Sequence, residues 1–259
     1  MIYIVNVSGG LASFEALRRT IERYGVGNTV AVFADTLIED PDLYRFLDDT
    51  ERVLGVPITR LQDGRTPFEV WKQRRLIARI IRGNRVAKCS LELKRGVIDA
   101  WVAEHYPDGG YTLVFGYTWD EPHRMEKIAH RLAPVPTWFP LSEPPYLDKC
   151  GIAAIAQGLG IASPRLYEMG FSHNNCGGGC VWGGQAHWAH VHRVLPDVYA
   201  RWERAEQDYR EATGKDHSIL QKYTLHEYRT LVLEVQGEFD TDEWGGCGCF
   251  SSAYEGDPS

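Results

Sequence analysis

Hydrophobic and polar positions follow two alternating periods along roughly the first half of the chain. Short runs rich in β-branched and aromatic residues predict strands at 2–7, 29–34, 57–61 and 111–116. Between these runs, apolar residues recur at helical spacing over 11–24 and 41–54. Strands that alternate with helices are typical of a parallel sheet covered on both faces, so we expect a Rossmann-like α/β fold.

The pattern changes near residue 140. Prolines gather at positions 134, 136, 140, 144 and 145, and loops rich in glycine and cysteine follow, together with a long polar helix predicted at 197–213. We therefore expect an α/β domain over 1–140 and a Cys/Gly-rich extension of helices and loops over 141–259 that packs on it.

The first predicted strand runs directly into the turn SGGLAS at residues 8–13, after which a helix begins. Glycines at 9 and 10 allow a close backbone approach and positive φ, while Ser8, Ser13 and the amides at the helix start offer hydrogen bonds to a phosphate. Glycine also serves ordinary tight turns, so the turn by itself leaves both interpretations open. In a parallel sheet Ser8, Asp35 and Gly116 would all lie at the carboxyl ends of strands, where ligands bind.

Charged residues follow two of the other predicted strands. Asp35 could hold a ribose hydroxyl or a metal ion, whereas Asp40, which precedes a proline, is predicted to cap a helix. After the strand that ends near Gly116, the guanidinium of Arg124 is suited to a phosphate or sulfate. The alternative is that Glu121 and Arg124 pair with each other at i, i+3 on a helix surface.

Composition narrows the class of protein. The 259 residues are 44% hydrophobic, which is ordinary for a globular chain, and no apolar run is long enough to cross a bilayer. No signal peptide is recognisable, so we expect a cytoplasmic location and no membrane partner. The net charge of −7 argues against general nucleic-acid affinity. Basic residues between 74 and 95 could form a local groove or a solvated helix face.

The chain has six cysteines, and structural disulfides are not expected in a reducing compartment. Five of them are candidates for a shared site: Cys89, Cys176, Cys180, Cys247 and Cys249. Thiolates bind soft metals, and nearby glycines let backbone amides donate to sulfur, which suits an iron–sulfur cluster or zinc. The spacing leaves both metals open, and the alternative is that these are small buried side chains. Cys150 is predicted to pack in the core beside an apolar helix.

These motifs together resemble those of the phosphoadenosine-phosphosulfate reductase family, within the wider group of PP-loop adenine-nucleotide α-hydrolase-like proteins. The resemblance covers nearly the whole chain and is nearest to uncharacterised bacterial and phage members that share the segments HNNCGG and GCGCF. The motifs that carry it are the 8–13 turn, Asp35-Thr36, residues 89–94, Gly116 with Glu121 and Arg124, and the paired cysteines.

The resemblance implies an adenine nucleotide, either ATP or an adenylyl sulfate, lying across the carboxyl edge of the sheet, with Mg²⁺ as a further cofactor. Its phosphates would lie against the 8–13 turn. The nucleotide-binding residues implied in this way are Ser8, Gly9, Gly10, Ser13, Asp35, Lys94, Gly116, Glu121 and Arg124.

The same family includes reductases that hold a [4Fe-4S] cluster with a cysteine pair and a later Cys-x-x-Cys, and that attack sulfate with a separate C-terminal cysteine. Here Cys89 is single, and the later pair, Cys176 and Cys180, is spaced Cys-x-x-x-Cys. The resemblance implies that these three hold three irons and that Cys249 or Cys247 supplies the fourth ligand. The remaining tail cysteine would act as the nucleophile or as a sulfur carrier.

Two departures from the family leave the reaction open. The Glu-Cys-Gly tail of the reductases is replaced by Cys247-Gly248-Cys249-Phe250, and Ala12 stands where many ATP-splitting relatives carry Asp. The first function implied is therefore a sulfonucleotide reductase served by a thiol donor such as thioredoxin. The others are an ATP-dependent sulfurtransferase acting on a nucleic acid or small acceptor, and a sensor that binds nucleotide and cluster without turnover.

Overall fold

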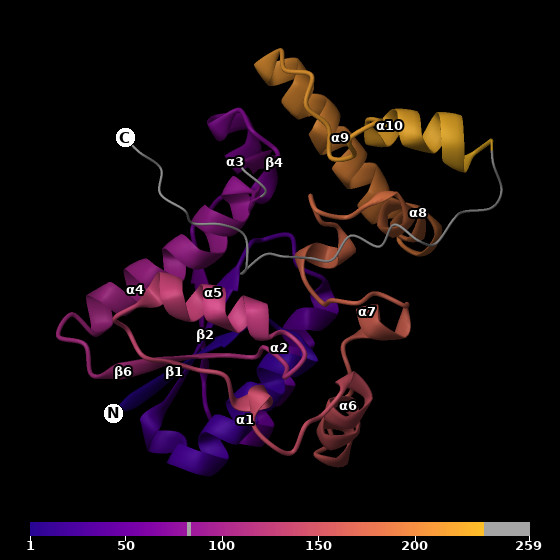
Figure 1. Ribbon diagram of the computed structural model, residues 1–259. Coiled ribbons are helices and arrows are strands. Elements are labelled where there is room, and N and C mark those ends of the chain that lie inside the picture. Colours follow the sequence, from indigo (N-terminus) through magenta and orange to yellow (C-terminus); the bar gives the residue numbers. More distant parts are fainter. Residues whose placement is uncertain (82–83, 236–259) are drawn as a thin grey trace. The chain divides into compact units, whose positions relative to one another are not determined.

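A computed structural model describes residues 1–81 and 84–235 (Figure 1). Its contacts divide the chain into two compact units. The first comprises Met1–Asp35, Asp40–Gln62 and Arg95–Asn175, and the second comprises Thr36–Glu39, Asp63–Lys94 and the chain from Cys176 onward. The units interleave along the sequence, so residues of both predicted domains, 1–140 and 141–259, occur in each.

The first unit is built on a five-stranded sheet in the order β3-β2-β1-β6-β7. All of its strand pairs are parallel, and their register places Val5 of β1 beside Ala31 of β2 and Val114 of β6. The strands are β1 (Ile2–Val7), β2 (Thr29–Asp35), β3 (Ile58–Gln62), β6 (Tyr111–Phe115) and β7 (Thr137–Trp138). The chain order reverses between β1 and β6, which makes the carboxyl ends of these two strands the topological switch point.

Helices cover both faces of this sheet, as the sequence predicts. On one face α1 (Leu11–Tyr24), α2 (Pro41–Leu54) and α6 (Lys149–Gly158) bury Phe14, Phe46 and Ile152 against Val5 and Phe33. Side chains alternate along a strand, so the buried residues between these positions face the opposite side. There α4 (Val97–His105) contacts β2 and β3, and α5 (Pro122–Leu132) lies close enough to α4 for their charges to interact.

Local sequence signals set the ends of these helices. The carboxylate of Asp40 caps α2 by accepting a hydrogen bond from the backbone N–H of Asp42 at 2.9 Å, and Gly55 ends the helix in the left-handed conformation. The predicted capping role of Asp40 is confirmed. By contrast, α1 begins after Gly10 with no hydrogen bond from a capping side chain of that residue.

The second unit contains the hairpin of β4 (Arg79–Ile81) and β5 (Asn84–Val86) and the helices α3 (Pro67–Arg74), α8 (Gln185–Val194), α9 (Pro196–Thr213) and α10 (Leu225–Tyr228). Its core is aromatic: Trp202 of α9 packs against Trp71 of α3 and Trp188 of α8, with ring centroids 5.4 and 5.3 Å away. The long helix predicted at 197–213 is confirmed as α9, and its buried aromatic residues are Tyr199, Trp202 and Tyr209. In the described part of the chain, none of the helices has the length and apolar character required to cross a bilayer.

Candidate functional site

The turn after β1 is held by its own two serines. The hydroxyl oxygen of Ser13 accepts hydrogen bonds from the backbone N–H of Ser8 at 3.0 Å and from the Ser8 hydroxyl at 3.1 Å. The Ser13 hydroxyl donates its proton to the carbonyl of Gly10 at 2.9 Å. This pattern fixes the shape of the turn and uses the Ser13 hydroxyl and the backbone N–H of Ser8 within the turn itself.

Glycines in and beside this turn are required by close packing. A Cβ at Gly9, where φ is +79°, would lie 2.6 Å from a side chain of α2, and one at Gly10 would lie 2.8 Å from the hydroxyl of Tyr167. At Gly116, directly after β6, a Cβ would lie 2.7 Å from the carbonyl oxygen of Ala12. Gly116 therefore lets the end of β6 approach the first turn of α1. The close approach at Gly116 is thus made to the protein's own backbone.

Two residues that the sequence interpretation did not select also touch the turn. The amide of Asn174 is buried and donates to the carbonyl of Gly9 at 2.7 Å. The hydroxyl of Tyr167 is hydrogen-bonded to the backbone of Leu11; burial raises its pKa, and that hydrogen bond opposes the shift. The only sequence signal for Asn174 is its place in the HNNC segment, and Tyr167 lies in a stretch without a motif.

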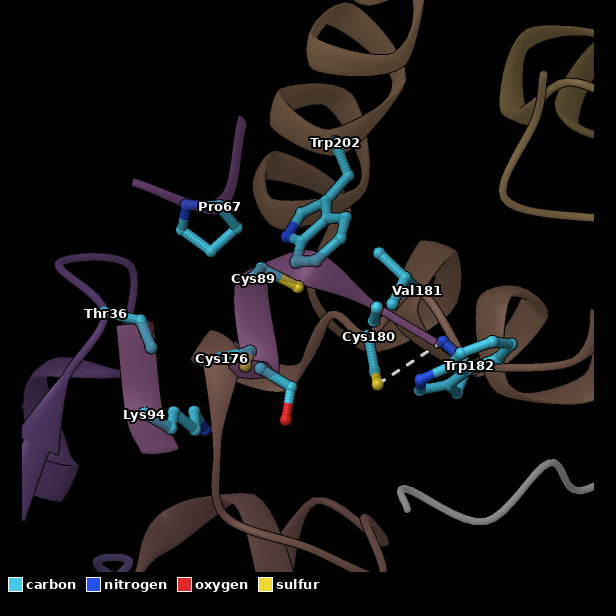
Figure 2. Close-up of a pocket in the computed structure, with 11 residues that line it drawn as sticks. Thr36, Pro67, Cys89, Lys94, Cys176, Cys180, Val181, Trp182 and Trp202 are labelled. Atoms are coloured by element: carbon cyan, nitrogen blue, oxygen red, sulfur yellow. Dashed lines mark hydrogen bonds between the residues drawn. The ribbon is translucent and has the colours of Figure 1, made fainter. Parts of the chain in front are cut away.

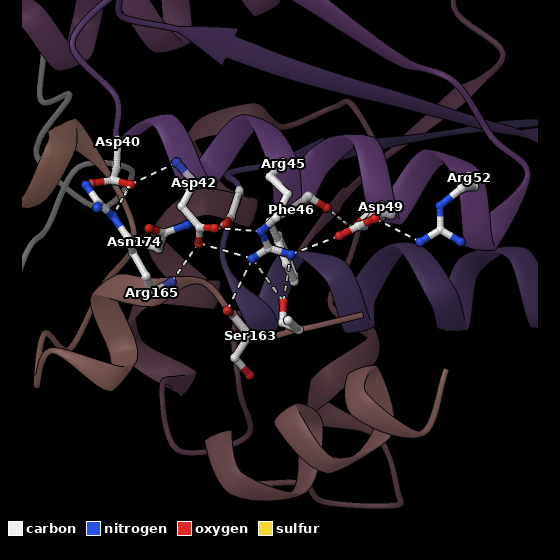
Figure 3. A network of polar contacts seen from close by, with 12 residues as sticks. Asp40, Asp42, Arg45, Phe46, Asp49, Arg52, Ser163, Arg165 and Asn174 are labelled. Carbon is white, nitrogen blue, oxygen red and sulfur yellow. Dashed lines mark hydrogen bonds and ion pairs between the residues drawn. The ribbon is translucent and has the colours of Figure 1, made fainter. Parts of the chain in front are cut away.

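Carboxylates follow β2, as predicted, and the structure gives each a partner. Asp35 accepts from the hydroxyl of Tyr44 through both oxygens, at 2.9 and 3.1 Å. Asp40 receives two hydrogen bonds from the guanidinium of Arg165, at 2.8 and 2.7 Å, and Asp42 accepts from the backbone N–H of Arg165. Figure 3 shows this network joining the start of α2 to the segment around Arg165.

Beyond β6, Glu121 and Arg124 pair with each other, as in the alternative that the sequence left open. Glu121 also accepts from the backbone N–H of Thr118 at 3.1 Å and from its hydroxyl at 3.0 Å. The guanidinium of Arg124 lies over the ring of Tyr117, 4.5 Å from its centroid, and burial raises the pKa of Tyr117 to about 12. The Nε of Arg124 is buried and finds no acceptor among the described residues. The ring of Tyr117 and the carboxylate of Glu121 thus orient the guanidinium.

The second unit contains a cavity that brings together three of the predicted metal ligands. Cys89, Cys176 and Cys180 line it, and so do Lys94 and Thr36 (Figure 2). The remaining lining residues are mostly apolar: Pro67, Ala87, Ser90, Val181, Trp182 and Trp202. Cys89 and Lys94 come from a segment far from Cys176 and Cys180 in sequence, so the fold, and not local spacing, collects these groups.

A buried carboxylate organises the wall of this cavity. Glu39 accepts hydrogen bonds from the backbone N–H of Cys176 and, at 2.8 Å, from the hydroxyl of Thr36. One of its oxygens lies 3.7 Å from the ammonium nitrogen of Lys94, and both side chains are buried. Glu39 was not among the predicted site residues, because its sequence neighbours, Asp40 and a proline, indicate a helix cap.

The turn between the two later cysteines has unusual backbone geometry. Cys176, Gly177 and Gly178 all have positive φ, at 52°, 61° and 87°. This conformation strains a non-glycine residue such as Cys176. In the same turn, the backbone N–H of Trp182 donates to the Sγ of Cys180 at 3.4 Å.

The cysteine arrangement bears on what the cavity could hold. Within the described ranges, no three Cys, His, Asp or Glu side chains are placed to hold one metal ion. The cysteines of a cluster each bind a different iron, whereas the ligands of a single zinc ion all meet at one point. Cys247 and Cys249, the predicted nucleophile and fourth ligand, lie outside the described residues.

Cys150 does not pack in the core, so that prediction is wrong. Its side chain is exposed. Cys150 lies in the first turn of α6, two residues before Ile152, which is fully buried against the sheet. Because two residues rotate the chain by about 200° around a helix axis, Cys150 faces away from the sheet.

Comparisons with known proteins give one point of reference. No family model and no curated protein matches the chain. Among solved structures, the chain is similar to the crystal structure of phosphoadenylyl-sulfate (PAPS) reductase from Candida auris in a phosphate complex, with a TM-score of 0.46 and 12% identity over 68% of this chain and 81% of that chain.

Proposed function

We propose that the chain is an adenine-nucleotide-binding enzyme of sulfur metabolism that holds a [4Fe-4S] cluster. The observation that carries this proposal is the meeting of Cys89, Cys176 and Cys180 on one cavity. Lys94, the buried partner of Glu39, also lines this cavity. A lysine ammonium beside thiolates offsets the negative charge that thiolate ligands and sulfide bring.

The nucleotide part of the proposal rests on the first unit. The 8–13 turn follows β1 at the switch point of the sheet, and the 14-residue helix α1 begins within it with no side-chain cap at Gly10. A helix start of this kind attracts phosphate through its dipole and its N–H groups. Arg124, which follows β6, adds a guanidinium suited to the phosphate or sulfate of the nucleotide.

The three cysteines supply a soft, sulfur-rich ligand set, which fits the cluster implied by the resemblance. Cys89, Cys176 and Cys180 would each hold one iron, and Cys249 or Cys247 would hold the fourth. The bound cluster would supply a fixed charge distribution. Lys94 would balance the charge of the ligand thiolates, and Glu39 would hold Lys94 and the Cys176 turn in place.

In the reaction we propose, a tail thiolate, Cys247 or Cys249, attacks the sulfur of an adenylyl sulfate. An S–S bond forms, the bond between sulfur and the bridging phosphate oxygen breaks, and the adenosine phosphate leaves with the electron pair. A dithiol donor of the thioredoxin type then attacks the enzyme thiosulfonate and releases sulfite. Its two thiols become a disulfide, so the donor supplies the two electrons.

Metal analysis of protein purified without oxygen tests the cluster. We expect about four iron and four acid-labile sulfide per chain, and loss of iron in Cys176→Ser and Cys180→Ser. Cys150→Ser is the matched control, because this exposed cysteine should leave the iron content unchanged. Stoichiometric zinc, or iron retained in the first two variants, would contradict the assignment.

Product analysis tests the reaction. A reductase releases sulfite from adenylyl sulfate or its 3′-phosphorylated form in the presence of a thiol donor, and Cys247→Ser or Cys249→Ser abolishes the release. Consumption of ATP that depends on a nucleic-acid or small-molecule acceptor would instead identify a sulfurtransferase. Nucleotide binding with neither product would identify a sensor.

A further inference from the structure

Three tryptophans at the centre of the second unit bury their indole N–H groups. The Nε1 atoms of Trp71, Trp188 and Trp202 are inaccessible to solvent and meet no hydrogen-bond acceptor in the described part of the chain. A buried donor without an acceptor costs about 1–3 kcal/mol. Of these three rings, Trp202 also lines the cavity of Cys89, Cys176 and Cys180.

The turn from Cys176 to Cys180 packs closely against the indole nitrogen of Trp202. Gly179 lies between Cys176 and Cys180, and a Cβ at this position would come closer than 3.0 Å to the Nε1 and Cε2 atoms of the Trp202 ring. Glycine at 179 therefore lets the turn close directly on the nitrogen edge of the indole. Figure 2 shows this edge of the ring on the side of Pro67 and Cys89, and not on the side of Val181.

We propose that the indole N–H of Trp202 donates a hydrogen bond to a sulfur atom of the cluster that Cys89, Cys176 and Cys180 hold. This inference rests on the proposed function, because the acceptor belongs to the bound group. An N–H donor beside sulfur stabilises the added negative charge of the reduced cluster, so it raises the reduction potential. Trp202 is then a positioning residue that tunes the cluster from the wall of the cavity.

The test compares Trp202→Phe with Trp188→Phe in the full chain, purified without oxygen. Both variants remove a buried indole N–H from the same aromatic core, but Trp188 is not among the residues that line the cysteine cavity. We expect both to keep iron and sulfide. We expect the reduction potential, followed through the visible spectrum, to shift to more negative values in Trp202→Phe and to stay at the wild-type value in Trp188→Phe.

A second variant keeps the test decisive if Trp202→Phe does not fold. Gly179→Ala retains the indole but adds a methyl group where the ring nitrogen now lies, so it should shift the potential in the same direction. If the variant that folds has the same reduction potential as the wild type, the role of Trp202 is overturned and the cluster is not. The same holds if Trp188→Phe shifts the reduction potential as much as Trp202→Phe does. Wild-type protein without iron would overturn the cluster itself, and this inference with it.

Discussion

The carboxylate of Glu39 binds the backbone N–H of Cys176 and lies 3.7 Å from the ammonium nitrogen of Lys94. One buried carboxylate thus contacts both Cys176, whose backbone is strained, and Lys94, which lines the same cavity. The chain segments that meet here are far apart in sequence. The geometry of the cavity therefore depends on the contacts of a single buried carboxylate.

Replacing Glu39 with glutamine should destabilise the protein and reduce its metal content. Glu39→Gln keeps the size of the side chain but removes the negative charge that faces Lys94. It also replaces one of the two carboxylate oxygens, which accept hydrogen bonds from Thr36 and Cys176, with an NH₂ group that cannot accept one. For a buried, charge-assisted contact we expect a loss of about 2 kcal/mol in the free energy of unfolding. Urea denaturation and iron analysis measure the two effects.

Glu22→Gln is the control for this substitution. Its carboxylate pairs with Arg18 on the surface of α1, with 68% of the side chain exposed. A change of less than about 0.5 kcal/mol is expected for such a pair. Equal losses for the two variants would contradict a special role for Glu39. Recovery of stability in the double variant Glu39→Gln/Lys94→Met would locate the cost in the uncompensated ammonium.

Gly9→Ala should damage the turn after β1. Alanine at φ +79° costs about 1 kcal/mol in backbone strain, and the added methyl group meets Leu43 at 2.6 Å, which adds a packing cost of about 1–3 kcal/mol. We expect a loss of at least about 2 kcal/mol in the free energy of unfolding and weaker binding of adenosine phosphates. Gly27→Ala is the matched control, because its Cβ would meet open space. Thermal unfolding measures the effect, and equal melting temperatures for Gly9→Ala and Gly27→Ala would contradict this role of Gly9.

Arg124→Lys should weaken nucleotide binding without much change in folding. Lysine keeps the positive charge but loses the planar fork that stacks on Tyr117 and contacts Glu121. One charge-assisted hydrogen bond to a phosphate or sulfate corresponds to about tenfold in affinity. Calorimetric titration with adenylyl sulfate measures the change. Unchanged affinity would remove Arg124 from the proposed site, and Arg23→Lys, at an exposed position of α1, serves as control.

The sequence was sufficient where structure is specified locally. The bounds of α1 and α2 agree with the predicted ranges, because a glycine turn precedes the first, and Asp40 and Gly55 mark the ends of the second. The two-residue strand β7 escaped prediction because its place in the sheet depends on pairing with β6, not on a hydrophobic run of its own.

The sequence predicted the cysteines of the candidate site, but not the residues that hold the cysteine and glycine turns in place. Cys89, Cys176 and Cys180 carry a chemical signal in their residue type, and the structure collects them at one cavity. Glu39 and Asn174 act through contacts with distant backbone groups, which no local pattern reveals. Residues of this kind become visible only when the fold brings the segments together.

Stability in acid should depend on Asp42, which lies at the centre of the network in Figure 3. Hydrogen bonds from the Arg45 guanidinium, and then from the backbone N–H of Arg165, hold the pKa of Asp42 below its usual range. The folded state therefore binds a proton at Asp42 less readily than the unfolded state. The stabilisation is present above the unfolded pKa of about 3.9 and is lost as the pH falls through the lower, folded value.

Asp42→Asn removes this contribution. The variant should be less stable than wild type at pH 7, and the difference between the two proteins should narrow steadily as the pH is lowered below about 4. Urea denaturation at a series of pH values measures it, with Asp108→Asn, at an exposed position, as the control. A difference that stays constant from pH 7 to pH 2 would show that Asp42 acts through packing and not through its charge.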